Sequence, residues 1–192
     1  MSAHDGEVVS LSLTDPSQFA TIFDRHVDAV RRFVVRRLGS SRSDDVISEV
    51  FRVAFERRDV FDTHVESGLP WLYGIASNLV RRECRSRTRH AAALERVGGR
   101  REDMGDPYLD LVARVDARSE LAGLRRAVLS LTDDEREMLL LVAWEQLSPT
   151  EAAAVLGIPP ATARTRLHRA RQQIRRQLEQ ERGEAKEPVT DA

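Results

Sequence analysis

Apolar residues recur at helical spacing in three successive segments of the first half of the chain. The first segment runs from Pro16 to Leu38, and Gly39 follows it. Ser43 can cap a second helix, and Pro70 suits the first turn of a third. The apolar positions are Phe19, Ile22, Phe23, Val27, Val30, Val34 and Leu38, then Val46, Ile47, Val50, Phe51, Ala54 and Phe55, then Trp71, Leu72, Ile75, Ala76, Leu79 and Val80. Their spacing predicts three amphipathic helices that share one core.

Helical spacing returns in the second half of the chain, beyond a charged stretch that glycine and proline interrupt. The apolar residues from Leu121 to Leu131 predict one helix. Thr132 and Glu135 then form a capping-box pattern in front of an apolar helix that reaches Leu147. The charged stretch between the two halves has the composition of a flexible linker.

The most informative segment of the chain begins at Ser148 and reads as two helices joined by a tight turn. Ser148 and Glu151 form a second capping box, and Gly157 can adopt the positive φ that ends a short helix. Pro159-Pro160 opens the next helix, which carries six arginines and no acidic residue up to position 176. A helix-turn-helix lays its second helix in the major groove of DNA, so we interpret this segment as a DNA-binding unit. The alternative is a solvated basic helix at the end of an ordinary bundle.

These patterns predict an all-α chain of two small helical domains joined by a flexible linker, with the helix-turn-helix in the C-terminal domain. Both ends of the chain lack helical periodicity, and the end beyond Glu181 is polar, so we expect both to be loose. The expected divisions are a flexible N-terminus at 1–15, a helical domain at 16–92, a linker at 93–118, a helix-turn-helix domain at 119–180 and a disordered tail at 181–192.

Charge is segregated along the chain, although the formal net charge of the 192 residues is only -1. Five arginines lie between Arg81 and His90 against one acid, Glu83, and a second cluster runs from Arg164 to Arg176. Acidic residues gather between the two clusters. Because local field governs the attraction to phosphate, the pattern predicts two contacts on one polyanion.

Composition excludes several classes of protein. Hydrophobic residues make up 41% of the chain, enough for a core, and aromatic residues only 5%, which favours helices over a sheet sandwich. Cys84 is the only cysteine, so neither an internal disulfide nor a multi-cysteine zinc site can form. The N-terminus is acidic and lacks a secretory signal, and the longest apolar stretch, Met138 to Trp144, is too short to span a bilayer. We expect a cytoplasmic protein without membrane insertion.

An enzymatic function is disfavoured by the distribution of possible ligands. A metal-dependent nuclease or recombinase could use Asp44, Asp45 and Glu49, but it would need further carboxylates or histidines near them. No such residue stands at a helical offset nearby, and the histidines are scattered. We therefore expect a non-catalytic protein with no cofactor and no bound metal.

Two ordered blocks of sequence resemble the extracytoplasmic-function (ECF) sigma factors, the smallest members of the sigma-70 family. The first block has FDRHVDAVRRFVVRRLG, SDDVISEVFRVAF and WLYGIASNLVRRECRSRTR in that order. The second has LTDDEREMLLLVAWEQLSPTEAAAVLGIPPATARTRLHRARQQIR. Together they cover most of residues 19–178. The resemblance implies that the blocks are the family's regions two and four, with region three missing.

The resemblance implies a function in the initiation of transcription. The chain would bind core RNA polymerase through the clamp coiled coil, recognise the minus-35 and minus-10 elements of promoter DNA, and promote opening of the promoter. It also implies an anti-sigma factor as a partner. The alternative is a helix-turn-helix transcription regulator that acts without being a polymerase subunit, which would leave the first block without a task.

The resemblance also assigns residues to these tasks. The polymerase-binding residues are Asp44, Asp45, Glu49, Val50 and Phe51. The minus-10 DNA-binding residues are Asn78, Arg81, Arg82 and Arg85, with the loop from Phe61 to Leu69 as the wall of a base pocket. The minus-35 residues are Arg164, Thr165 and His168 for bases and Thr162, Arg169 and Arg171 for phosphates.

Three of these assignments leave alternatives open on the residues alone. Asp45 and Glu49 stand four residues apart and form an acidic strip, which could equally be a solvated face above Val50 and Phe51 in the core. Trp71 could stack on a base, but at helical spacing it is favoured as a core residue. Arg166 could brace the fold or touch the DNA backbone.

Overall fold

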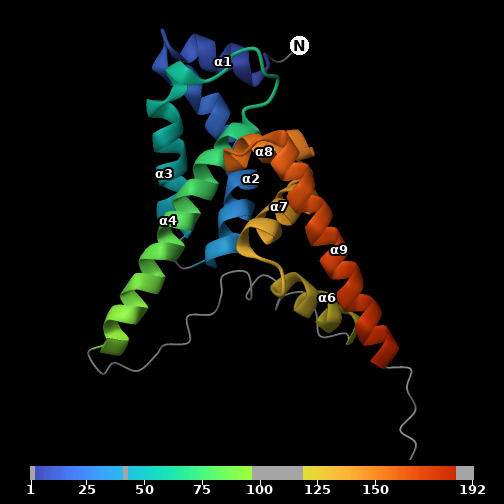
Figure 1. Ribbon diagram of the computed structural model, residues 1–192. Helices are drawn as coiled ribbons and strands as arrows, with labels where there is room; N and C mark the ends of the chain where they lie inside the picture. Colours follow the sequence, from blue (N-terminus) through green and yellow to red (C-terminus); the bar gives the residue numbers. More distant parts are fainter. Residues whose placement is uncertain (1–2, 41–42, 97–118, 185–192) are drawn as a thin grey trace, which may run out of the picture. The chain divides into compact units, whose positions relative to one another are not determined.

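The computed structural model describes residues 3–40, 43–96 and 119–184 of the chain (Figure 1). Within these residues there are eight α-helices, two 3-10 helices and no strand, which confirms the all-α class. The chain divides into two compact units, residues 1–107 and 108–192.

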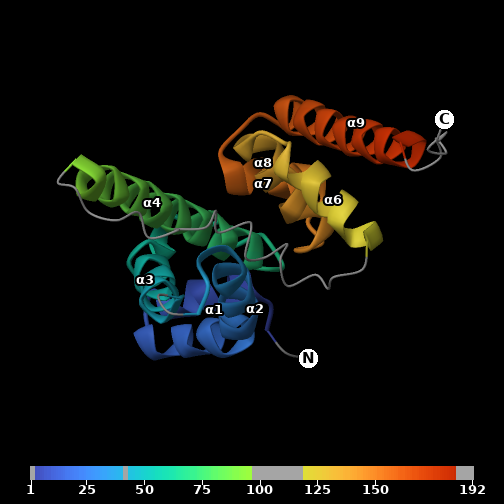
Figure 2. The same cartoon turned by 90° about the horizontal axis from the view of Figure 1, so that it is seen from below.

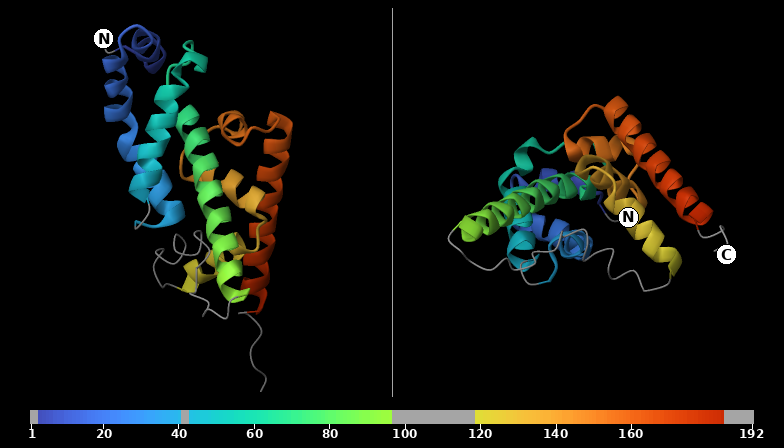
Figure 3. Two further views of the ribbon diagram at one scale, coloured as in Figure 1. Left: turned by 90° about the vertical axis from the view of Figure 1, so that its left-hand side faces the viewer. Right: turned by 60° about the horizontal axis from the view of Figure 1, so that its bottom comes forward.

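The first unit is built on the three helices that the apolar spacing predicts. They are α2 (Ala20–Leu38), α3 (Ser43–Glu56) and α4 (Leu69–Arg96), and each contacts the other two. The short 3-10 helix η1 (Pro16–Phe19) precedes α2, and η2 (Arg58–Val60) follows α3. Figure 3 shows the three long helices side by side, with the C-terminal end of α4 projecting beyond the other two. Their buried side chains include Ile22, Val30, Phe33, Val34, Ile47, Val50, Leu72, Ala76 and Val80.

The expected flexible N-terminus is wrong for most of its length, because residues Asp5–Ser12 form a helix, α1. Val8 and Val9 are 5% and 1% exposed, so α1 packs on the unit, while Leu11 is 54% exposed. Two adjacent valines and an exposed leucine do not make an apolar stripe, which explains why periodicity did not reveal the helix. Contacts with other elements stabilise α1 instead, and they are described below.

Two expected boundaries also shift. Helix α4 continues to Arg96, four residues into the segment assigned to the linker, and α9 continues to Glu184, beyond the expected start of the tail. The rest of the expected linker and tail, residues 97–118 and 185–192, lies outside the described residues.

The second unit consists of four helices, with α9 as the longest. They are α6 (Ser119–Leu129), α7 (Asp133–Ala143), α8 (Pro149–Leu156) and α9 (Pro160–Glu184). Figure 2 shows α6, α7 and α8 along one side of α9, and each of them contacts it. The shared core includes Ala127, Met138, Leu141, Ala152, Ala163, Leu167 and Ala170.

Both predicted capping boxes are confirmed. The Thr132 side chain accepts from the Glu135 N–H at the start of α7, and Ser148 accepts from Glu151 at the start of α8, with both reciprocal bonds present. Gly157 ends α8 with a φ of 65°, the left-handed conformation that favours glycine. The turn of the helix-turn-helix is therefore specified by local residues at both ends of α8.

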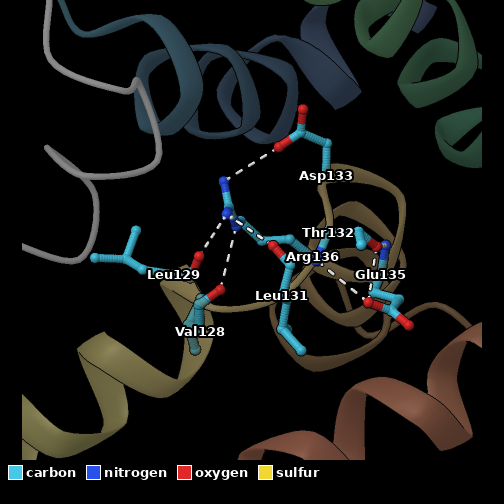
Figure 4. Close-up of polar contacts among 7 residues, drawn as sticks. All are labelled: Val128, Leu129, Leu131, Thr132, Asp133, Glu135 and Arg136. Carbon is cyan, nitrogen blue, oxygen red and sulfur yellow. Dashed lines mark hydrogen bonds and ion pairs between the residues drawn. The ribbon is translucent and has the colours of Figure 1, made fainter.

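A buried arginine joins α6 to α7 (Figure 4). The Arg136 guanidinium donates from Nε to the Val128 carbonyl at 3.2 Å and from Nη2 to the carbonyls of Leu129 and Leu131, both at 3.0 Å. Nη1 lies 3.5 Å from an Asp133 carboxylate oxygen. The last carbonyls of a helix lack intrahelical partners, so Arg136 satisfies the end of α6 and sets the turn into α7.

Candidate functional site

The acidic strip, Asp45 and Glu49, lies on the surface of α3. Asp45 is exposed and Glu49 is half-buried, and the neighbouring Asp44 is exposed with its carboxylate 3.0 Å from Arg31. Glu49 accepts hydrogen bonds from the Arg52 guanidinium at 2.6 and 2.7 Å. These bonds, helped by the attraction of Arg52 and Arg82, hold the pKa of Glu49 below its ordinary value against the opposing effect of burial. Glu49 is therefore a carboxylate at neutral pH.

Two of the residues expected to bind polymerase, Val50 and Phe51, are buried in the core of the first unit. Val50 is 0% and Phe51 6% exposed, and the Phe51 ring packs against that of Phe23, with centroids 4.8 Å apart. Burial of this degree leaves the two side chains little surface to offer another protein. The two residues instead hold the helix that carries the acidic strip, which was the alternative interpretation.

The basic face of α4 consists of Asn78, Arg81, Arg82 and Arg85. Asn78, Arg82 and Arg85 are exposed and Arg81 is half-buried. Their spacing of three or four residues places them on one face of the helix. The face offers amide and guanidinium donors, which can bind phosphate and base edges.

A groove separates α3 from α4 and brings the two candidate surfaces together. It is lined by Asp45, Val46 and Glu49 from α3 and by Leu79, Arg82, Glu83, Ser86 and Arg89 from α4. Arg82, on the basic face, therefore shares the groove with both acids of the acidic strip.

The loop from Phe61 to Leu69 joins the end of η2 to α4, and its first residue is not available as a pocket wall. Phe61 is 8% exposed and packs against Trp71, with ring centroids 4.8 Å apart. This contact gives Trp71 a packing role, which its helical spacing favoured over stacking on a base. Polar side chains are exposed in the middle of the loop, at His64, Glu66 and Ser67.

One carboxylate that sequence reasoning missed lies beside this loop. Asp5, the first residue of α1, has a side chain only 6% exposed. Its Oδ1 accepts from Arg25 Nη1 at 2.9 Å, and its Oδ2 lies 2.6 Å from His26 Nε2 and 2.8 Å from the Gly68 nitrogen, which donates to it. No local pattern marks Asp5, because these partners lie 20, 21 and 63 residues away along the chain.

The environment of Asp5 favours its charged form. Burial alone would raise the pKa of this carboxyl group, but the hydrogen bonds from Gly68, Arg25 and His26 and the attraction of His26 lower it below the ordinary value. A carboxyl group whose pKa is lower in the folded state contributes stability above its unfolded pKa. That contribution disappears as the pH falls through the folded pKa.

We expect Asp5→Asn to lower the free energy of unfolding of the first unit by about 2 kcal/mol at pH 7, where the buried charge-assisted bonds are intact. As the pH falls below about 3.9, the ordinary pKa of an aspartate, the difference from the wild type should shrink, because protonation then favours the unfolded wild-type chain. Urea unfolding followed by Trp71 fluorescence in a Trp144→Phe background measures this unit. Asp28→Asn, on the exposed surface of α2, is the control. A difference that does not change with pH would contradict the prediction.

The exposed face of α9 contains the residues expected to read the minus-35 element. Arg164, Thr165, His168, Arg169 and Arg171 are exposed and Thr162 is half-buried. The opposite face is in the core, with Ala163 and Ala170 at 0% and Leu167 at 4% exposure. The structure therefore brings all six predicted residues to the surface of one helix, at its N-terminal half.

Two details of α9 refine the role of single residues. Arg166 Nη2 lies 2.7 Å from Asp134 Oδ2, which ties α9 to α7 and gives Arg166 the bracing role. The Thr165 hydroxyl donates to the Ala161 carbonyl at 3.0 Å, so towards DNA it can accept a hydrogen bond.

Among the described residues, no group of three or more His, Cys, Asp or Glu side chains could hold a metal ion. None of the helices described in them combines the length and the apolar character needed to cross a membrane.

Comparison with known proteins gives the same two blocks. Residues 22–90 match the family described as Sigma-70 region 2, and residues 121–174 match Sigma-70, region 4. RNA polymerase sigma factor CarQ from Myxococcus xanthus is 30% identical over 165 residues, which cover 83% of this chain and 88% of CarQ. ECF RNA polymerase sigma factor SigW from Bacillus subtilis is 29% identical over 173 residues, which cover 85% and 90%.

Solved structures of similar fold include two complexes. CnrH, in complex with the cytosolic domain of CnrY, has a TM-score of 0.59 and 26% identity, covering 91% of this chain and 97% of that one. The sigma factor RpoE from Bartonella quintana, in complex with the anti-sigma factor NepR, has a TM-score of 0.60 and 21% identity, covering 84% and 96%.

Proposed function

The chain belongs to the sigma-70 family, within its ECF group, and we propose from this that it binds core RNA polymerase, recognises the minus-35 and minus-10 promoter elements and promotes promoter opening. The observation that carries the proposal is the presence of regions two and four in order on one chain, each with an exposed basic helical face. The protein acts by binding, in the cytoplasm.

The first unit would hold polymerase and the minus-10 element. Asp44 and the acidic strip are exposed carboxylates on α3, suited to basic side chains on the clamp coiled coil. The basic face of α4 would hold the separated strands, with guanidinium groups on phosphates and Asn78 on a base edge. The exposed middle of the loop before α4 would form the wall of a pocket for an unstacked base.

The second unit would read the minus-35 element in the major groove. Arg164 and His168 are four residues apart on the exposed side of α9, so both can face base edges. Arg169 and Arg171 carry charge that suits phosphate. Because both units lie on one chain, binding by one raises the effective concentration of the other at its own site.

An anti-sigma factor is the further partner that we propose. Its support is the fold shared with RpoE, whose structure was solved in complex with the anti-sigma factor NepR. The surfaces available to such a partner include the acidic strip and the exposed face of α9.

Run-off transcription tests the function as a whole. Core polymerase and a promoter library are incubated with the full chain, with a form that ends before Ser119, or with no addition. We expect specific transcripts only with the full chain. A pull-down with core polymerase separates this proposal from the helix-turn-helix regulator. Equal transcription with the shortened form, or no retention of polymerase, would contradict the proposal.

Arg164→Ala and Arg171→Ala are expected to weaken binding to the minus-35 element in different ways. Loss of a base contact at Arg164 should cost about 1–3 kcal/mol and relax the preference at the base pairs it reads. Loss of a phosphate contact at Arg171 should weaken all sequences alike and reduce the salt slope by about 1. Binding to specific and random duplexes at several salt concentrations measures both. If Arg164→Ala weakened specific and random DNA equally, its base-reading role would be wrong.

A further inference from the structure

Helix α1 lies directly against the loop that precedes α4. A Cβ atom at Gly6 would collide with the carbonyl oxygen of Thr63 and lie 2.9 Å from that of Val65. The Asp5 nitrogen donates to the Glu66 carbonyl at 3.1 Å. The two backbones therefore touch, and only glycine at position 6 permits the approach.

Both ends of α1 are tied to the segment between α3 and α4. At the first end, Asp5 accepts from the Gly68 N–H at 2.8 Å, immediately before α4 begins. At the other end, the Ser12 carbonyl accepts from Arg58 Nε in η2 at 3.3 Å. α1 therefore runs along the loop, with Gly6 in contact with the middle of it.

The same carboxylate anchors this arrangement to the helical bundle. Asp5 binds Arg25 and His26, which both belong to α2. Since the Asp5 side chain is 6% exposed, these bonds are shielded from water and hold their geometry better than a surface ion pair. The loop is thus fixed to α2 through α1.

We propose that α1 positions this loop for the minus-10 element, with Asp5 and Gly6 as the positioning residues. The inference rests on the proposed function of the loop as the wall of a base pocket. The exposed side chains of His64, Glu66 and Ser67 can select a base only if the backbone beneath them keeps one conformation. A loop ordered before binding also avoids the entropic cost of ordering during it.

The test uses two variants with different chemistry and one control on the same helix. Gly6→Ala pushes the backbones apart and leaves every charge in place. Asp5→Asn keeps the shape of the side chain and removes its charge, so it remains informative if Gly6→Ala does not fold. Ser10→Ala changes an exposed residue of α1 and should leave both measurements unchanged.

Two measurements are made on the full chain. The first is hydrogen exchange at the Gly68 N–H and the neighbouring loop amides, which reports local opening of the loop. The second is binding of the chain with core polymerase to single-stranded oligonucleotides randomised across the minus-10 element. We expect exchange at Gly68 to rise at least about 10-fold in both variants and the ratio of best to average oligonucleotide binding to fall several-fold. Binding of a minus-35 duplex should not change.

Each contrary result would contradict a different part of the proposal. Unchanged exchange at Gly68 would show that α1 does not hold the loop. Faster exchange with unchanged oligonucleotide preference would show that α1 stabilises the unit without serving recognition. If the wild type itself had no preference among the oligonucleotides, the proposed role of the loop would fail and the positioning role with it.

Discussion

Replacing Asp45 and Glu49 together by lysine is expected to weaken the binding of core RNA polymerase by at least ~100-fold, because like charges facing each other across an interface cost several kcal/mol. The two acids form the acidic strip of α3, and neither is buried. The core residues Val50 and Phe51 hold the fold beneath them, and the pair of Glu49 with Arg52 is exposed, so the fold depends little on these charges. The variant should therefore remain folded while its affinity for core RNA polymerase falls.

Titration of labelled protein with core polymerase at two salt concentrations measures the effect. The matched control is Asp24→Lys with Asp28→Lys, which changes two exposed acids of α2 by the same charge. If the control lost as much affinity as the strip variant, total charge rather than the strip would govern binding. Retained binding by the strip variant at both salt concentrations would refute the assignment of α3.

Arg136→Met is expected to destabilise the second unit by about 3 kcal/mol, because hydrogen bonds from a charged donor are worth about 1.5–3 kcal/mol and a buried acceptor left unsatisfied costs about 1–3 kcal/mol. Methionine fills a similar space but donates to none of the three carbonyls that Arg136 now satisfies. The end of α6 and the turn into α7 should loosen first. Promoter binding should then fail at a lower temperature, with the recognition residues of α9 unchanged.

Urea unfolding followed by Trp144 fluorescence in a Trp71→Phe background measures this unit alone. Arg166→Met is the control. Arg166 forms an ion pair with Asp134, whose side chain is 66% exposed. We expect the control to cost less than about 1 kcal/mol, as exposed pairs do. Equal losses in the two variants would mean that the buried carbonyls gain nothing from Arg136.

The parts of the fold that the sequence predicted are those specified by residues close together in the chain. The capping boxes at Thr132 and Ser148 each need a partner three residues later, and the glycine turn at Gly157 needs none. The three apolar stripes of the first unit are likewise visible within single segments. Both units could therefore be predicted before any contact between helices was known.

What escaped prediction depends on contacts between distant segments. α1 is held by Asp5 and Gly6, whose partners lie far away along the chain in the first unit. Its buried residues Val8 and Val9 are adjacent, so they do not form an apolar stripe that periodicity could reveal. Only the Asp134 ion pair assigns Arg166 a bracing role. Burial also divides the expected polymerase contacts into surface acids and core residues, a division that the resemblance alone did not make.

If the acidic strip binds polymerase and the basic face binds DNA, the groove between α3 and α4 couples the two affinities. Arg52 is the main partner of Glu49, and Arg82 attracts Glu49 more weakly across the groove, so Glu49 and Arg82 act as weak counter-ions of each other. A protein that neutralises Glu49 withdraws that counter-ion and leaves Arg82 a stronger ligand for phosphate. By thermodynamic reciprocity, DNA on Arg82 frees Glu49 for its own partner. Cooperativity between polymerase and promoter would then need no change of shape, and added salt would diminish it.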